Sequence, residues 1–243
     1  MGPILLVLGT LLVTQAAVVA TSVYLHRGLA HRALTLHPLA DWVFRLVVWI
    51  FTGQNRREWV AVHRKHHAFT DTERDPHSPL VHGLWRIQLW NVYYYLREAR
   101  NPETTARWAK DIPTDMWDRV LFNRGGLGGI VGVAAAILAL GAGPGLLLAM
   151  GHFVLYVFVL APSVNGLGHW RGRRTFSDHS ATNLRVLAWL TGGESLHNNH
   201  HARPASPKFS MARLEFDPSW VVIRALMVLR LARPVGVQSK PAA

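Results

Sequence analysis

The chain has 243 residues, of which 50% are hydrophobic and 16% are charged, and its formal net charge is +12. Soluble domains average about 25% charged residues, so this composition favours a membrane protein. Cysteine is absent, which excludes disulfides, cysteine-ligated zinc, iron–sulfur clusters and thiol catalysis. Every lysine and arginine lies in residues 27–124 or 171–240. We interpret this segregation as the positive-inside pattern of a membrane protein, and we expect no nucleic-acid partner.

The first apolar window is PILLVLGTLLVTQAAVVATSVYL, residues 3–25. It is long enough to cross a hydrocarbon core of roughly 30 Å. A cleaved signal peptide would have an early positive charge and a shorter apolar stretch, so we predict a retained transmembrane helix. Residues 41–53 are apolar but shorter, which predicts a re-entrant or interfacial segment.

Two later segments have the composition of a membrane interface. Residues 84–96 are rich in tryptophan and tyrosine, and residues 219–232 carry two arginines on an otherwise apolar stretch. Aromatic residues gather at headgroup level, and amphipathic helices lie along the membrane surface. Helices that pack against a water-exposed part of the protein explain both segments equally well.

A second apolar region runs from residue 125 to residue 163 and is interrupted by GAGPG at residues 141–145. Glycine and proline in this pattern mark a turn, so we predict two further spans near residues 126–141 and 145–162. Small residues in both favour close helix–helix packing. We expect His152, inside the second span, to bond a neighbouring helix rather than a metal.

These windows predict an all-α integral membrane protein with about three transmembrane helices, interfacial helices and a histidine-rich helical cap. We expect one domain over residues 1–243, with the cap formed by residues 26–124 and 163–235 on the cytoplasmic face. The last residues, 237–243, read as a loose tail.

The fourteen histidines are grouped. Four motifs, HRGLAH, HRKHH, NGLGH and HNNHH, contain His26 and His31; His63, His66 and His67; Asn165 and His169; and His197, His200 and His201. The second and fourth motifs share the spacing i, i+3, i+4, which places three side chains on one helix face. All four motifs follow a span or lie in a basic block, so we expect them to converge on one side of the membrane.

The spacing within the two shorter motifs differs. Asn165 and His169 are four residues apart and align on a helix. His26 and His31 are five residues apart and do not share a face of an ideal α-helix. We therefore expect one of these two histidines to lie where the helix ends or bends.

Nine converging imidazoles predict a site with two metals. Neutral imidazole suits iron, zinc, copper and nickel, and a structural zinc would be satisfied by four ligands. Carboxylates commonly orient such rings through the other ring nitrogen. The candidates for that role are Glu58, Asp71, Asp75, Asp178 and Glu194. No HExxH motif occurs, and Glu-x-x-His occurs only once, at residues 194–197.

The combined motifs HRGLAHR, EWVAVHRKHH, TDTERDPH, NGLGH and GESLHNNHH extend from about residue 18 to residue 235. Together they resemble the integral-membrane fatty acyl desaturases with histidine boxes, most closely the acyl-CoA Δ9-type branch. The resemblance implies two ferrous ions held by nine histidines, with an asparagine that contacts one metal through water. Carried over motif by motif, these residues are His26, His31, His63, His66, His67, Asn165, His169, His197, His200 and His201.

The resemblance also implies an activity: insertion of a cis double bond into a long acyl chain, with O₂ as co-substrate and two external electrons. The implied substrate is an acyl-CoA, with an acyl carrier protein or a lipid as open alternatives. Residues 1–243 contain no recognisable electron-carrier module, so we expect a separate donor protein and reductase. Members of the family usually have two spans before the first histidine motif, whereas this chain has room for one.

Two other functions fit part of the pattern. The same scaffold serves fatty acyl hydroxylases and acetylenases. A metal-handling membrane protein would need ionisable groups inside its spans, where only His152 qualifies. Trp59 is expected to line an acyl tunnel or to pack in the core. Five arginines could hold a charged headgroup or could be ordinary loop charge, namely Arg56, Arg57, Arg171, Arg173 and Arg174.

Overall fold

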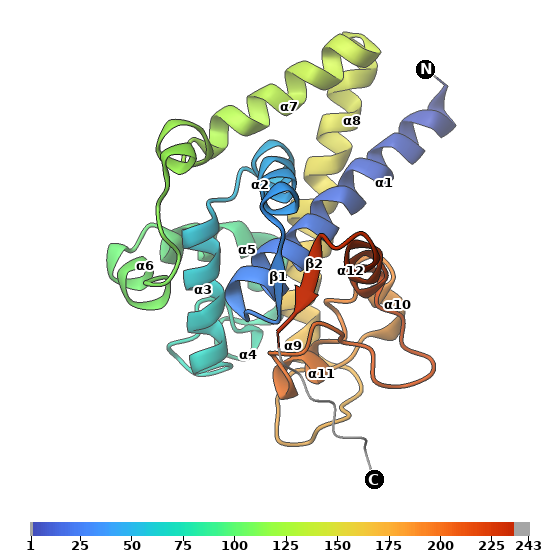
Figure 1. Ribbon diagram of the computed structural model, residues 1–243. Helices are drawn as coiled ribbons and strands as arrows, with labels where there is room; N and C mark the ends of the chain where they lie inside the picture. The colour runs from blue at the N-terminus through green and yellow to red at the C-terminus, as the bar shows by residue number, and fades with distance from the viewer. Residues whose placement is uncertain (1, 236–243) are drawn as a thin grey trace.

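The computed structural model describes residues 2–235, so the tail predicted over residues 237–243 lies outside the described part. The chain is mostly helical, as predicted, and a two-stranded sheet joins distant parts of it (Figure 1). Strand β1 (Leu34–Leu36) pairs antiparallel with β2 (Ala232–Pro234), with Leu34 opposite Pro234. This sheet was not predicted, because each strand has only three residues.

The first long helix begins at a proline and changes its hydrogen-bonding pattern half way along. Helix α1 (Pro3–Ala20) continues directly into η1 (Thr21–Ala30), which is a π-helix. The combined 28 residues are long and apolar enough to cross a membrane. The predicted span, residues 3–25, therefore lies within one continuous helix that extends five residues further, to Ala30.

The second long helix has the same composite character. Helix α8 (Ala142–Val154) passes into the π-helical segments η3 (Leu155–Leu160) and η4 (Ser163–Leu167) and ends as α9 (Gly168–Trp170). It too is long and apolar enough to cross a membrane. Helix α7 (Gly125–Leu140) precedes it. The turn predicted at residues 141–145 is confined to Gly141, whose φ is +84°, because residues 142–145 already belong to α8.

Helix α7 packs closely against α2 (Pro38–Thr52) through glycine. A Cβ atom added to Gly128 would lie 2.1 Å from the carbonyl oxygen of Trp49. One added to Gly125 would lie 2.0 Å from the carbonyl oxygen of Gly53. Only glycine permits this approach of two helix backbones. The segment predicted to be re-entrant or interfacial is therefore a helix that packs against α7.

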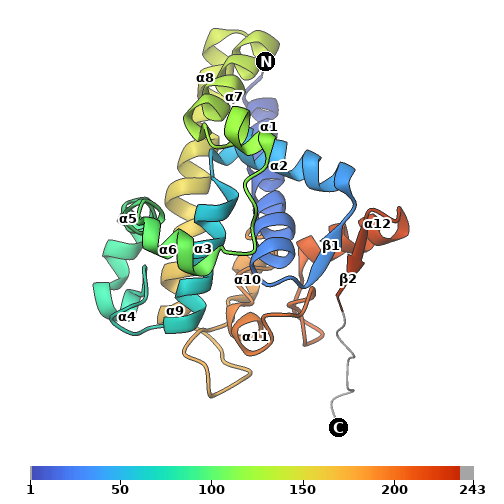
Figure 2. The same cartoon turned by 60° about the vertical axis from the view of Figure 1, so that its left-hand side comes forward.

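The remaining helices surround the lower parts of the two long helices and form with them the lower body of the molecule (Figure 2). Their bounds are α3 (Arg56–Phe69), α4 (Pro79–His82), α5 (Leu84–Ala99), α6 (Pro102–Trp108), η2 (Asp118–Phe122), α10 (Arg185–Ala188), α11 (His197–Ala202) and α12 (Pro218–Val228). Helix α3 starts where the side chain of Asn55 accepts hydrogen bonds from the amides of Arg57 and Glu58, which caps the helix.

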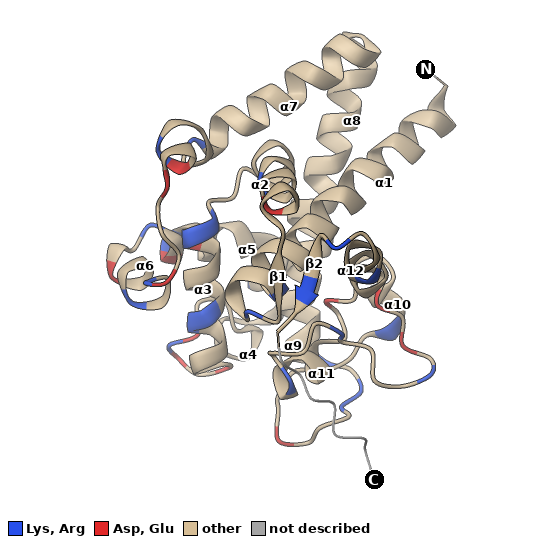
Figure 3. Ribbon diagram, viewed as in Figure 1, with Lys and Arg blue, Asp and Glu red and all other residues tan. Residues whose placement is uncertain are grey.

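Charge and apolar exposure are unevenly distributed. Figure 3 shows the charged residues in the lower body, whereas the upper parts of α1, α7 and α8 carry none. In the lower body, α5 exposes Trp85, Trp90 and Tyr93, and α12 exposes Val221 and Val228. These apolar side chains are not covered by the described part of the chain, which agrees with the interfacial prediction for both segments.

Candidate metal centre

The nine predicted histidines come together in the lower body as two groups. The five-histidine group contains His26, His31, His63, His67 and His200. The four-histidine group contains His66, His169, His197 and His201. Within each group, one nitrogen from every ring lies within 4.8 Å of the others. The convergence predicted from the motifs is therefore present.

The spacing of His26 and His31 is explained by the π-helix. In η1 the hydrogen bonds link residues i and i+5, so residues five apart lie one turn apart. The amide of His31 donates to the carbonyl oxygen of His26 at 3.0 Å, and the ring centroids are 4.9 Å apart. His31 also ends the helix, as one of these two histidines was predicted to do.

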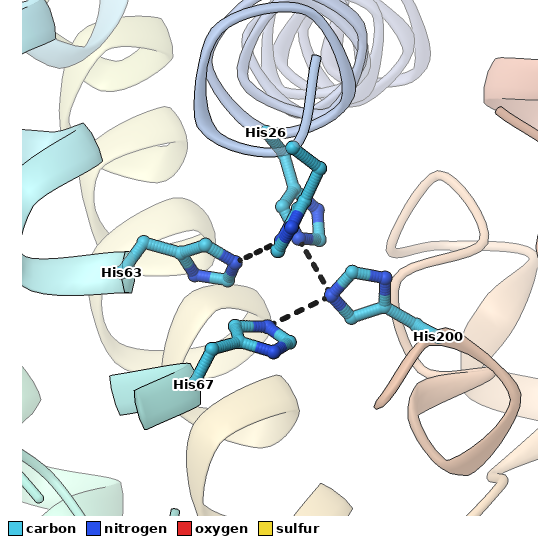
Figure 4. A group of neighbouring side chains, drawn as sticks. His26, His63, His67 and His200 are labelled. Carbon is cyan, nitrogen blue, oxygen red and sulfur yellow. Dashed lines mark hydrogen bonds between the residues drawn. The ribbon is translucent and has the colours of Figure 1, made fainter. Parts of the chain in front are cut away.

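The two i, i+3, i+4 triplets each serve both groups. On α3, His63 and His67 belong to the five-histidine group and His66 to the four-histidine group. On α11 the division is reversed, because the central histidine of that triplet, His200, joins the five-histidine group. Figure 4 shows His26, His63, His67 and His200 turned toward one another from three different elements.

The ring nitrogens of each group face one another at short range. In the five-histidine group, the Nε2 atoms of His31 and His63 are 2.8 Å apart, and those of His26 and His200 are 3.0 Å apart. In the four-histidine group, Nε2 of His201 lies 3.2 Å from Nε2 of His197. So many inward-facing nitrogen atoms suit a cation at the centre of each group.

Three of the five candidate carboxylates hold the outer nitrogens of these rings. Glu194 accepts a hydrogen bond from Nδ1 of His26. Oδ2 of Asp75 lies 2.9 Å from Nδ1 of His66, and Oδ2 of Asp71 lies 2.9 Å from Nδ1 of His169. Each contact leaves Nε2 pointing inward. Such carboxylates orient metal-binding imidazoles.

The other two candidate carboxylates do not contact a grouped histidine. Asp178 is exposed and lies 3.6 Å from His179. Glu58 lines a neighbouring cavity, where burial raises the pKa of its carboxyl group. The sequence alone did not separate these two from the three carboxylates that hold rings, since all five lie near a histidine motif.

Burial favours the neutral form of five of the grouped rings. It lowers the pKa of His63 and His67 in α3, and of His197, His200 and His201 in α11, well below the usual histidine value, and neighbouring imidazoles lower it further. Neutral imidazole is the form that binds metals. Burial alone would raise the pKa of Asp75, but His66 and His77 outweigh it and hold that pKa below its usual range.

Comparison with known proteins shows to which family the chain belongs. The sequence model of the fatty acid desaturase family matches residues 2–218. The chain belongs to the fatty acid desaturase family. It is accordingly an oxidoreductase that acts on fatty acyl groups, and the family resemblance noted in the motifs is confirmed.

Similar desaturases occur in plants and in a cyanobacterium. An acyl-CoA 5-desaturase of Anemone leveillei is 31% identical over 227 residues, which cover 92% of this chain and 69% of that protein. A Delta-9 acyl-lipid desaturase of Arabidopsis thaliana is 30% identical, covering 88% of this chain and 69% of its own length. The sn-1 stearoyl-lipid 9-desaturase of Synechocystis sp. is 30% identical, covering 89% and 67%. These names associate similar chains with both acyl-CoA and acyl-lipid substrates.

A cavity of about 410 Å³ adjoins the desaturase's histidine groups. His26, His63 and His197 are among its lining residues, and so are Phe153 and Val157. An apolar cavity of this size suits a hydrocarbon chain. The lining thus includes histidines of both groups and apolar residues of the second long helix.

Trp59 packs in the core and also lines the cavity beside the histidine groups. Its ring stacks on that of His63, with centroids 4.9 Å apart and planes 13° apart, and it lines the cavity. It also packs against the buried residues Val60 and Ala61 of the core. Its ring therefore forms cavity wall and at the same time supports a histidine of the five-histidine group.

Asn165 lies outside both histidine groups. It is in the π-helical segment η4, and its Nδ2 atom donates to Oδ1 of Asn91 at 3.0 Å. Both asparagines line the cavity. The alignment predicted for Asn165 and His169 assumed α-helical geometry, whereas η4 changes to α9 between them. Contact of Asn165 with a metal through water stays a prediction.

Two important side chains near the site were not predicted. His77 is buried and its ring stacks on that of His66, with the ring centroids 4.7 Å apart. Neither ring nitrogen of His77 has a hydrogen-bond partner within residues 2–235. Arg27 is fully buried beside His26 and donates to both carboxylate oxygens of Asp217, at 3.0 and 2.9 Å. The DPH sequence marks His77, but no local signal links Arg27 with a carboxylate 190 residues away.

The five candidate headgroup arginines fall into two sets. Arg56 donates to Asp118 at 2.7 Å, and Arg57 donates to Thr114 at 2.9 Å. Both therefore hold the segment before α7 in place. The other three lie on an exposed loop after α9, namely Arg171, Arg173 and Arg174.

Proposed function

We propose that this chain is a membrane di-iron desaturase that inserts a cis double bond into a long fatty acyl chain. The observation that carries the proposal is the pair of histidine groups at the end of an apolar cavity. O₂ would be the co-substrate, and two electrons would come from a separate donor protein and its reductase. Two hydrogens from adjacent methylenes, O₂, two electrons and two protons give the double bond and two waters.

The donor set supports two iron ions. Nine imidazoles exceed the four ligands of one structural zinc, and they divide into groups of five and four that could each hold one ion. Iron bound there would supply the oxidising power, drawn from O₂, that protein side chains lack. The proposed ligands are the nine grouped histidines, with Asn165 contributing through water.

The protein's own residues would orient the imidazole rings, exclude water and position the acyl chain. Glu194, Asp75 and Asp71 hold the outer nitrogens of three rings, so that the inner nitrogens keep their direction. Burial lowers the pKa of five of the grouped imidazoles, which favours their neutral form, and would limit the access of water. The cavity beside Trp59 would hold the acyl chain in one extended path, so that the same methylenes lie next to the histidine groups in each turnover.

Membrane topology is part of the proposal. The two long helices, with α7 as a third, would span the membrane as a single domain with the rest of the chain. At 1.5 Å per residue α7 is about 24 Å long, somewhat short of a hydrocarbon core of roughly 30 Å. The segregated positive charge supports placing the histidine groups on the cytoplasmic face, with α5 and α12 at the interface.

The substrate would be an acyl-CoA or an acyl-lipid, because similar proteins are named for both. Acyl-CoA is favoured by the resemblance of the motifs, and an acyl carrier protein is a further alternative. Product analysis on each substrate class, supplied separately to membranes containing the chain, would decide between them.

The decisive experiment expresses the full chain with an electron donor and reductase, then profiles acyl products by mass spectrometry. We expect monounsaturated products from the wild type, and none from His200→Ala, because that histidine belongs to the five-histidine group. His179→Ala is the matched control, since His179 lies outside both groups. Iron content is measured in all three proteins. Hydroxylated products would favour the alternative chemistry, and unchanged activity in His200→Ala would refute the ligand assignment.

A further inference from the structure

A second cavity, of about 500 Å³, lies among the long helices. Its lining is almost entirely apolar and includes small residues of α7, such as Gly132, Ala136 and Ala139. His152 is its one imidazole, and both ring nitrogens are engaged: Nδ1 lies 3.1 Å from Oγ1 of Thr14, and Nε2 lies 2.8 Å from the carbonyl oxygen of Phe51. The hydrogen-bonded histidine predicted within this span is thus confirmed, and the cavity offers a ligand no free imidazole.

The two cavities follow one another along the same helices. On the second long helix, Leu160, Ala161, Val164 and Asn165 line only the first cavity. Leu148, Ala149 and His152 line only the second. Phe153, Tyr156 and Val157 lie between these stretches and line both. On the first long helix the order is the same, with His26 and Thr21 in the first cavity and Val13 in the second. The cavities are therefore in series, leading away from the histidine groups.

Tyr156 stands at the junction of the cavities and is fixed there. It is buried, and its hydroxyl group lies 2.7 Å from Oγ1 of Thr21. Thr21 is the first residue of η1, and Tyr156 is the second residue of η3, so each long helix changes from α to π geometry at this level. Such π segments are frequent at functional sites. Ala17, Val18 and Leu160 pack against the tyrosine.

We propose that Tyr156 is the partition that ends the acyl cavity, and that the second cavity is the space into which longer chains would extend if the partition were removed. The inference rests on the proposed function and adds a specificity-determining residue to it. The occupant of the second cavity would be the methyl end of the acyl substrate, because the two cavities share walls and the second is lined by hydrocarbon. From residue 157 to residue 148, nine helical rises of 1.5 Å add about 14 Å of depth.

The test supplies membranes containing the full chain with saturated acyl substrates of increasing length, and measures the ratio of longer to shorter unsaturated products. Tyr156→Ala should raise that ratio by on the order of tenfold, since each methylene accommodated in an apolar pocket changes specificity by at least that factor. Tyr156→Phe keeps the ring and should leave the ratio within about twofold of the wild type. Val154→Ala is the matched control, because this neighbour lines neither cavity.

Two further variants keep the proposal testable if Tyr156→Ala does not fold. Val157→Phe adds bulk to the shared wall and should lower the ratio. Ala149→Phe fills the second cavity; combined with Tyr156→Ala it should restore the wild-type ratio. An unchanged ratio in a folded, active Tyr156→Ala protein would overturn the inference, and would indicate that a membrane lipid fills the second cavity. Absence of unsaturated product from wild type and Val154→Ala would instead contradict the proposed function.

Discussion

Oδ2 of Asp75 lies 2.9 Å from Nδ1 of His66, while Nε2 of the same ring lies 3.4 Å from Nε2 of His201. The carboxylate is itself fixed, because it accepts hydrogen bonds from the amides of Asp71 at 2.8 Å and His77 at 3.0 Å. Asp75 therefore connects the loop after α3 with His66 and fixes the orientation of that ring in the four-histidine group.

Asp75→Asn should weaken metal binding at the four-histidine group. An amide is a poorer acceptor than a carboxylate, and loss of such a partner typically lowers metal affinity by about 10- to 100-fold. We expect the metal content of purified protein to fall from two ions per chain toward one after dialysis, as measured by inductively coupled plasma mass spectrometry. Asp178→Asn, at an exposed carboxylate outside the groups, should keep both ions. Full retention by Asp75→Asn would contradict the role given to this carboxylate.

Removal of either partner of the Arg27–Asp217 pair should strongly destabilise the fold. Arg27 also donates to the carbonyl oxygens of Pro207 and Gly192, so it ties η1 to the segments around α11. Breaking a buried pair leaves one charge uncompensated, which costs about 3–5 kcal/mol. Arg27→Met, Asp217→Asn and the double variant would be compared by thermal unfolding in detergent. The double variant should lose less than the sum of the single losses, and strictly additive losses would show that the two charges are not coupled.

The contact between α2 and α7 should be sensitive to a single methyl group. Gly128→Ala would place a Cβ atom 2.1 Å from a backbone oxygen of α2, so the helices must separate. Overpacking of this kind costs about 1–3 kcal/mol, and we expect a lower melting temperature. At the adjacent Gly129, an added Cβ meets nothing within 4 Å. Gly129→Ala should therefore melt like the wild type, and equal melting of both variants would argue against the observed packing.

The Arg64–Asp111 pair should make the stability of the folded protein depend on pH in the acid range. Hydrogen bonds from Arg64, and also from Arg32, hold the pKa of Asp111 below its usual range. A carboxylate with a lowered pKa stabilises the fold above its unfolded pKa, about 3.9, and this contribution is lost as the pH falls further through the folded pKa. Asp111→Asn should thus melt below the wild type at neutral pH, with the difference narrowing below about pH 3.9. A gap that stays constant down to the lowest accessible pH would exclude this linkage.

The sequence was informative where the signal is local. The motifs around His63 and His197 identified the grouped histidines, because spacings of three and four residues act within one helix turn. Charge segregation and the GAGPG turn predicted the extents of the apolar helices. Sequence periodicity cannot show a π-helix, so the common face of His26 and His31 was missed. The division of the rings into two groups was missed as well, because neighbouring histidines of one motif join different groups.

Other features depend on contacts that no local pattern encodes. Arg27 reads as one more basic residue of a cytoplasmic loop until Asp217 is seen beside it. Strand β1 meets β2 across almost 200 residues, and three-residue strands leave no alternation to detect. The two cavities are likewise products of packing, since their walls come from several helices. For these features the three-dimensional arrangement was required.

His66 and His67 are consecutive residues of α3, yet they serve different histidine groups. Their Cα atoms are one peptide unit, about 3.8 Å, apart. The distance between the two histidine groups is thus tied to covalent geometry rather than to flexible loops. A small rotation of α3 about its axis would move nitrogen atoms out of both groups together. The two groups would consequently form, or be disrupted, as one unit.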